Sequence, residues 1–277
     1  DQFCYMRINH AYIYAGKDSV SEDESRIGCG PYIFDSFNKE AGTISFTANP
    51  NYPTQPNVGK IVYRLFGNDD TMYDEEADKL RAKLKDEKMF LMNLMSSPGS
   101  GKTTTLLATI QRLKGKYRIA VMEADIDSDV DAKKIATTGV ESIQLHTGGM
   151  CHLDAGMTAQ GLTELRTENI DLAVLENVGN LVCPAEFDTG ASKNVMILSV
   201  PEGHDKPLKY PLIFTVCDAL IINKIDVMPY FDFDMDKVRE FALMRNPKLK
   251  IFPVSAKTGE GMEDWCSWLS EQVDSWN

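Results

Sequence analysis

Apolar and polar positions follow a regular order from about residue 73 onward. Ala77, Leu80 and Leu84 recur at helical spacing in a segment with acidic residues early and lysines late, which predicts a helix. The next run, 89–95, is short and continuously apolar, as in a buried parallel strand. Further apolar runs alternate with helical stretches, and we interpret them as strands near 117–124, 141–146, 170–177, 194–200, 217–224 and 249–256. This alternation predicts an α/β fold with a doubly wound, mostly parallel sheet and helices on both of its faces.

The first part of the chain has a different pattern. Residues 42–49 have the β-branched and aromatic character of a strand, and the prolines of 49–57 favour a turn because they would interrupt a helix. No helix of useful length fits before about Thr71. We therefore predict two parts, a short segment rich in strands and turns over 1–64 and an α/β domain over 65–277.

Composition excludes several classes of protein. The 277 residues carry a formal charge of −12, and no basic stripe offsets it, so a nucleic-acid partner is not expected. No apolar run is long enough to predict a membrane-spanning helix, and no basic-then-apolar leader predicts a signal peptide. The 6 cysteines are scattered without a C-x-x-C pair, which favours free thiols in a reducing, cytoplasmic compartment.

The loop after the first long apolar run carries a phosphate-binding motif. The stretch "SSPGSGKTTT" fits the pattern GxxxxGK[ST], except that Ser96 replaces the first glycine. Glycines let backbone N–H groups close around phosphates, Lys102 would reach the β and γ phosphates, and the Thr103 hydroxyl would bind Mg²⁺. The start of a helix adds a positive field there. The motif predicts a P-loop NTPase whose phosphate contacts are Gly99, Ser100, Gly101, Lys102, Thr103 and Thr104.

Two later motifs indicate which base is bound. Asn223, Lys224 and Asp226 follow a predicted strand, and a carboxylate there can accept hydrogen bonds from both N1–H and the exocyclic amine of guanine. Adenine lacks this pair of donors, and leaving buried polar groups unmatched is costly. After the next strand, Ser255, Ala256 and Lys257 are placed to flank the base. The motifs together predict GTP.

Acidic residues at two other strand ends complete the predicted catalytic set. Glu176 is expected to hold the water shell of Mg²⁺, and Gly179 to sense the γ-phosphate. Glu123 and Asp125 end another strand, and we choose Asp125 for a switch or Mg²⁺ role. The predicted catalytic residues are Lys102, Thr103, Asp125 and Glu176. The sequence identifies no group that would position the attacking water, so slow hydrolysis is expected.

An adjacent cysteine and histidine raise the question of a metal site. Cys151 and His152 alone are more typical of an ordinary turn, but Cys183 follows the Gly179 region closely. All three are expected near strand ends on the nucleotide side. Two thiolates and an imidazole suit zinc or nickel, and three ligands leave a position that a second subunit or a transferable metal could fill.

Six separated stretches, in order, carry a family resemblance. They are "NLMSSPGSGKTTTLL", "GMCHLDAGM", "ENVGNLVCPAEFD", "SVPEGHDKPLKYP", "NKIDVMPYF" and "SAKTGEGM". Over about 65–277 the chain resembles the hydrogenase maturation nickel-insertion GTPases of the HypB family, in which a serine also begins the P-loop. The resemblance implies a GTPase of low turnover that forms a nucleotide-dependent homodimer and helps insert nickel into the hydrogenase large subunit. It also implies a HypA-type nickel chaperone and the large-subunit precursor as partners, and a nickel or zinc site at Cys151, His152 and Cys183.

Two other functions stay open at this point. The urease accessory nickel GTPases are close relatives, although the residues around "LVCP" and "GHDKPLKYP" favour hydrogenase. A metal-binding module with a vestigial nucleotide site is the other, and the intact Lys102, Thr103 and Asp226 count against it.

The front segment resembles something else. Residues 27–64 are similar to a piece of the peptide- or nickel-binding proteins of ABC importers, through 30–32, 49–52 and 60–64. Such proteins need two lobes and a cleft, for which this segment is too short. We therefore expect a fused fragment without a complete binding site, and no high-affinity nickel storage, because Cys-rich and His-rich nickel motifs are absent from this part of the sequence.

Overall fold

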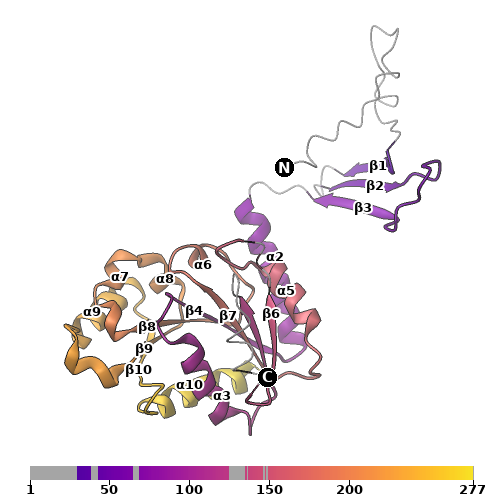
Figure 1. Cartoon of the computed structure of the whole chain (residues 1–277). Helices are drawn as coiled ribbons and strands as arrows, with labels where there is room; N and C mark the ends of the chain where they lie inside the picture. Colours follow the sequence, from indigo (N-terminus) through magenta and orange to yellow (C-terminus); the bar gives the residue numbers. More distant parts are fainter. Residues whose placement is uncertain are drawn as a thin grey trace. The chain divides into compact units, whose positions relative to one another are not determined.

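The computed structural model describes residues 30–38, 43–64, 69–124, 135, 137–145, 147 and 149–276. The chain divides into two compact units, Asp1–Met72 and Tyr73–Asn277 (Figure 1).

The first unit contains a three-stranded antiparallel sheet in the order β1-β2-β3. The strands are β1 (Tyr32–Asn38), β2 (Thr43–Ala48) and β3 (Lys60–Arg64). Phe46 on the middle strand makes edge-to-face contacts with Phe34 and Tyr63, at centroid distances of 6.0 and 5.8 Å. The expected strand at 42–49 and the turn after it are confirmed, whereas β1 and β3 were not predicted as strands.

The second unit is built on a seven-stranded sheet in the order β10-β9-β8-β4-β7-β5-β6. Every strand pair of this sheet in the described residues is parallel, and all seven strands expected from the apolar runs are present. The α/β prediction is therefore confirmed. The strands are β4 (Phe90–Ser96), β5 (Ile119–Ala124), β6 (Glu141–Leu145), β7 (Leu172–Gly179), β8 (Lys193–Ser199), β9 (Ala219–Asn223) and β10 (Lys250–Pro253).

Helices cover both faces of this sheet. The longer ones are α2 (Asp69–Asp86), α3 (Lys102–Leu113), α5 (Ala155–Glu164), α8 (Pro211–Val216), α9 (Met235–Arg245) and α10 (Met262–Trp276). Short turns α6 (Cys183–Glu186), η3 (Val200–Glu202), α7 (Lys206–Lys209) and η4 (Ile225–Tyr230) follow strand ends. Helix α2 starts at Asp69, earlier than expected. No helix in the described part of the chain has the length and apolar character needed to cross a bilayer.

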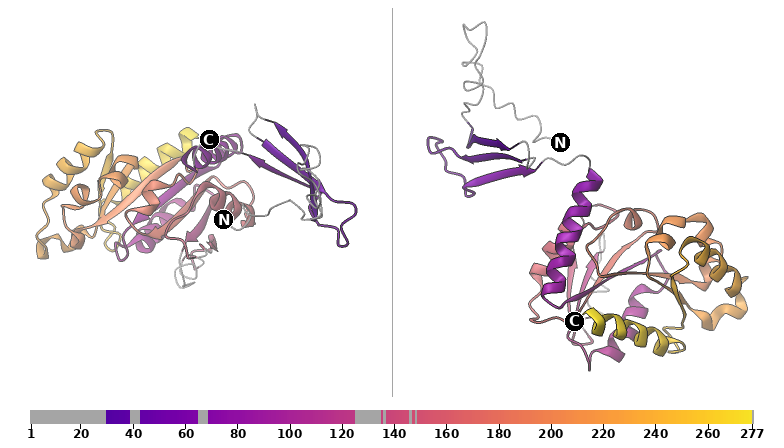
Figure 2. Two further views of the ribbon diagram at one scale, coloured as in Figure 1. Left: turned by 90° about the horizontal axis from the view of Figure 1, so that it is seen from above. Right: turned by 180° about the vertical axis from the view of Figure 1, so that it is seen from behind.

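The alternation of side chains along β4 explains this layering. Phe90, Met92 and Leu94 pack with the buried residues of α3 and α10, whereas Leu91 packs with those of α2 and α5 on the opposite face. Figure 1 shows α3 and α10 together on one side of the sheet, and Figure 2 gives the same layers from above and from behind. Because successive side chains of a strand point to opposite faces, a continuously apolar strand is buried on both.

The position of β4 decides where a ligand can bind. It lies between β7 and β8, and all three are parallel. Their carboxyl ends therefore meet at one edge, together with those of β5 and β9. Crevices at this edge are the usual binding sites of open α/β sheets.

Candidate nucleotide and metal sites

The loop 97–101 joins β4 to α3 and needs glycine at two places. Gly99 and Gly101 have φ values of +76° and +95°, in the left-handed region that favours glycine. At Gly101 a side chain also lacks room, because a Cβ atom would lie 2.5 Å from Nδ2 of Asn223. Backbone conformation thus requires glycine at both positions, and at Gly101 the close approach of the loop that carries Asn223 requires it as well.

A cavity of about 610 Å³ opens over this loop. Its wall includes a polar atom suited to a phosphate, since the hydroxyl of Ser100 is buried without a hydrogen-bond partner among the described residues. The first residues of α3, 102–104, line the same cavity, and the N-terminus of a helix favours a phosphate group. A phosphate group therefore fits the cavity. The lining residues are Ser97, Pro98, Gly99, Ser100, Gly101, Lys102, Thr103, Thr104, Glu123, Ala124, Glu176, Val178, Gly179 and Lys224.

Oxygen ligands suitable for Mg²⁺ lie at the sheet side of the cavity. The Thr103 hydroxyl donates to Oε1 of Glu176 at 3.3 Å, so these two predicted residues are brought together. Glu123 ends β5 on the same wall and accepts a bond from Ser142 at 3.3 Å. Hydroxyl and carboxylate oxygens are the ligands that Mg²⁺ prefers. Asp125, which we chose over Glu123, lies outside the described residues.

The second nucleotide motif braces the phosphate loop. Asn223 donates to the carbonyl of Ser100 at 3.0 Å and accepts from the N–H of Ala256 at 3.2 Å. Lys224 has φ +65° and donates from Nζ to the carbonyl of Gly99 at 2.6 Å. Three loops that are far apart in sequence are therefore joined by hydrogen bonds, of which those of Asn223 are buried or partly buried and that of Lys224 is exposed.

The proposed base-binding residues also lie together. The Ser255 hydroxyl donates to Oδ1 of Asp226 at 2.7 Å and accepts from the N–H of Thr258 at 3.1 Å. This chain of bonds orients the carboxylate, while Lys257 lies exposed on the same loop. A carboxylate held in this way can face two neighbouring donors on a base edge.

The structure brings together two of the three expected metal ligands. A hydrogen bond with the Cys183 thiol, with burial and Glu186 adding to it, raises the pKa of Cys151. The ring of His152 instead stacks on Phe187, at 3.6 Å between centroids and 7° between planes, and its buried Nδ1 has no hydrogen-bond partner among the described residues. Within those residues no group of three His, Cys, Asp or Glu side chains is arranged to hold a metal. The role of His152 stays a prediction.

Comparison with known proteins gives the family. Residues 90–253, more than half of the chain, match the model of the CobW/HypB/UreG nucleotide-binding domain. Hydrogenase maturation factor HypB of Escherichia coli K12 is 46% identical over 196 residues, which cover 71% of this chain and 68% of that protein. The chain belongs to the HypB family.

Other members agree in sequence and structure. HypB of Azotobacter chroococcum is 42% identical over 243 residues, covering 87% of this chain and 78% of its own length. The crystal structure of Helicobacter pylori HypB in complex with nickel has a TM-score of 0.69 and 38% identity, covering 74% of this chain and 96% of that one. HypB from Archaeoglobus fulgidus has a TM-score of 0.68 and 35% identity, covering 73% and 98%. As a member of the HypB family, this chain is a P-loop GTPase.

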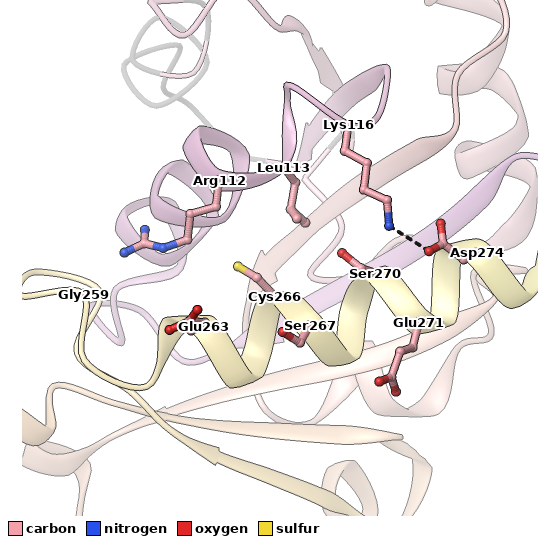
Figure 3. Close-up of a pocket in the computed structure, with 10 residues that line it drawn as sticks. All are labelled: Arg112, Leu113, Lys116, Gly259, Glu263, Cys266, Ser267, Ser270, Glu271 and Asp274. Atoms are coloured by element: carbon pink, nitrogen blue, oxygen red, sulfur yellow. Dashed lines mark hydrogen bonds and ion pairs between the residues drawn. The ribbon is translucent and has the colours of Figure 1, made fainter.

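A second cavity, also about 610 Å³, lies between α3 and α10 (Figure 3). Lys116 and Asp274 form an ion pair of 2.7 Å across it. Arg112 reaches the loop after β10, where a Cβ at Gly259 would lie 2.9 Å from the guanidinium. This groove is therefore bordered by the loop that carries Ser255 and Gly259, next to the Arg112 side chain.

No role was predicted for Glu202 from the sequence, although its side chain contacts the phosphate loop. Its carboxylate accepts a hydrogen bond from the Ser97 hydroxyl, and Ser97 lines the cavity. The signal was the spacing of Ser199 and Glu202, which fits the capping-box pattern S-x-x-E. The stretch contributed to the family resemblance, but its glutamate had been given no role.

Proposed function

We propose that this chain binds GTP with Mg²⁺ in the cavity at the end of β4, hydrolyses it slowly, and uses the nucleotide state to control a nickel ion. The observation that carries the proposal is the hydrogen-bonded frame of 99–101, Asn223 and Asp226. It supports phosphate and guanine recognition in one rigid unit. A site held in its binding conformation needs little ordering when the ligand arrives.

The residues around this frame have proposed roles in binding the nucleotide and in hydrolysis. Lys102 would contact the β and γ phosphates, Thr103 would bind Mg²⁺, and Glu176 would hold the water shell of the metal; all three line the cavity. Bound Mg²⁺ would neutralise negative charge on the phosphates. Asp226 accepts from guanine, and Ser255 keeps it oriented. Asp125 keeps its proposed switch or Mg²⁺ role.

Nickel is the proposed cargo of the Cys151 and Cys183 pair. Thiolates bind nickel or zinc, and binding through both sulfurs would release both thiol protons. His152 would become the third ligand by turning its ring away from Phe187. A partner copy completing the site would explain a nucleotide-dependent homodimer, and nickel would pass from a HypA-type chaperone to the hydrogenase large-subunit precursor in the cytoplasm.

A second client has support from two Helicobacter relatives. The Helicobacter pylori relative, 37% identical over 232 residues, is a hydrogenase/urease maturation factor HypB. Urease is therefore the alternative client for the same nickel chemistry. Nickel transfer to each apo-enzyme in vitro would decide between them.

A GTP titration tests the nucleotide proposal. Lys102→Ala should weaken GTP binding by on the order of a hundredfold, because charge-assisted bonds to phosphate are lost. Lys248→Ala, on an exposed turn, is the matched control and should bind as the wild type does. Equal binding by both variants would contradict the proposal and favour a metal-binding module with a vestigial nucleotide site.

A further inference from the structure

Glu202 joins the phosphate loop to the end of β8. Its Oε1 accepts a hydrogen bond from the Ser97 hydroxyl. Its Oε2 accepts from both the N–H and the hydroxyl of Ser199, at 2.7 Å each. Both carboxylate oxygens are thus engaged, one by the phosphate loop and the other by the strand end.

The position of Glu202 is set by its own turn. Ser199 and Glu202 form a capping box around η3, in which Pro201 occupies an early position. Gly203 follows with φ +90°, a conformation that favours glycine, and its N–H donates to the carbonyl of Val200 at 3.2 Å. The carboxylate is therefore a fixed point against which the loop can be held.

Neighbouring strands hold different parts of the loop. Asn223 and Lys224, after β9, hold the carbonyls of Ser100 and Gly99. Pro98 lies close to the end of β7, since a Cβ at Gly179 would be 3.2 Å from its ring. Among the described contacts, Glu202 is the partner of the Ser97 hydroxyl at the beginning of the loop, and the Ser97 carbonyl accepts from the Ser96 hydroxyl at 2.9 Å.

The bond also fixes what Ser97 can offer to the cavity. A serine hydroxyl has one proton and two lone pairs. Because the proton goes to Glu202, the oxygen presents only lone pairs to a ligand. Phosphate oxygens without protons cannot bind there, whereas a water molecule can donate to it.

We propose that Glu202 is a positioning residue of the GTPase site, which anchors the first half of the phosphate loop and sets Ser97 to accept a hydrogen bond from water beside the phosphates. This inference rests on the proposed GTP-binding function. Without the Glu202 carboxylate the phosphate loop can move, and without the Ser97 oxygen the water can move. Both changes slow hydrolysis more than they weaken binding, because misplaced reacting groups cost rate.

Single-turnover GTP hydrolysis by the whole chain tests this, with affinities for GDP and a non-hydrolysable GTP analogue measured alongside. Glu202→Gln keeps the size, but its amide group donates to Ser97 and reverses the bond. We expect Ser97→Ala and Glu202→Gln each to lower the rate about tenfold, and the double variant to be no slower than either. Reversal frees the Ser97 proton for phosphate, so Glu202→Gln should also shift the ratio of GTP-analogue to GDP affinity by about threefold, which Ser97→Ala should not.

Glu240→Gln makes the same replacement on an exposed position of α9 and should match the wild type in all three measurements. Effects of Ser97→Ala and Glu202→Gln that multiply, or a Glu202→Gln rate equal to that of Glu240→Gln, would overturn the inference. Lys102→Ala in the same assay separates the two proposals. If Lys102→Ala binds GTP as the wild type does, the proposed GTPase function fails. If Lys102→Ala loses GTP binding while Glu202→Gln hydrolyses GTP at the wild-type rate, only the positioning role of Glu202 fails.

Discussion

Replacing Gly101 by alanine should destabilise the second unit through a collision with Asn223. The residue has φ +95°, at which alanine costs about 1–2 kcal/mol. The new methyl carbon would lie 2.5 Å from Nδ2 of Asn223, a residue that is 2% exposed and whose side-chain amide has two hydrogen bonds to backbone groups. Moving the amide loses both bonds, at about 1 kcal/mol each. We expect the free energy of unfolding to fall by about 3–4 kcal/mol.

A double-mutant cycle tests the cause of this loss. In an Asn223→Ala background the amide is gone, so Gly101→Ala should cost only the backbone part, about 1–2 kcal/mol. Gly99→Ala is the matched control, because Gly99 has φ +76° but nothing lies within 4 Å of its Cβ position. Urea unfolding followed by tryptophan fluorescence reports the second unit, since all 3 tryptophans lie in α10. Equal losses for Gly101→Ala and Gly99→Ala, or an additive cycle, would refute the reasoning.

Three further outcomes are expected. Asp226→Asn should weaken GTP and favour XTP, because an amide can donate to the second base oxygen; unchanged preference in competition binding would contradict the base assignment. Hydrogen bonds from Arg118 lower the pKa of Asp171 in the folded chain, so the ionised carboxylate stabilises the fold at neutral pH, and Asp171→Asn should be less stable than the wild type there. This difference in stability should disappear as the pH falls below about 3.9, the unfolded pKa, and through the lower folded pKa. A difference in urea midpoint between the two proteins that stays constant with pH would count against it. Gly161→Ala should cost about 1–3 kcal/mol in the same unfolding assay, since its Cβ would lie 2.6 Å from Leu145; a stabilised variant would show that the core can adjust.

Much of the second unit was predictable because its signals are local. Each buried parallel strand appears as a short apolar run, and the glycines, Lys102 and Thr103 mark a loop whose shape is set by its own residues. Asn223 and Asp226 were found in the same way. Their joining by hydrogen bonds depends on β4 and β9 ending at one edge of the sheet, which follows from parallel topology.

Other features depend on contacts that residue type does not specify. The orientation of the His152 ring is decided by stacking on Phe187, from a segment beyond β7, so adjacency to Cys151 did not reveal it. The link between Ser97 and Glu202 joins residues that are distant in sequence. A sequence pattern marked the turn of Glu202, but the partner in the phosphate loop could be seen only in three dimensions.

The front segment was predicted least well. Its strands β1 and β3 pair antiparallel with β2 and are as long as several strands of the second unit, but they lack the continuous apolar runs that marked the buried strands. The match to the Azotobacter chroococcum relative is longer than the second unit, so it includes residues of the first. Whether residues 1–64 are a fused fragment stays a prediction.

Nickel binding in the two nucleotide states tests the central claim most directly. Isothermal titration of Ni²⁺ would be run with GDP and with a non-hydrolysable GTP analogue, on the wild type, on Cys151→Ala and Cys183→Ala, and on Cys217→Ala as a buried-cysteine control. The account predicts a site whose affinity differs between the two nucleotides, which either metal-site substitution abolishes and the control retains. Nickel affinity that is the same with both nucleotides, or that survives both metal-site substitutions, would contradict a nucleotide-controlled nickel site at this cysteine pair.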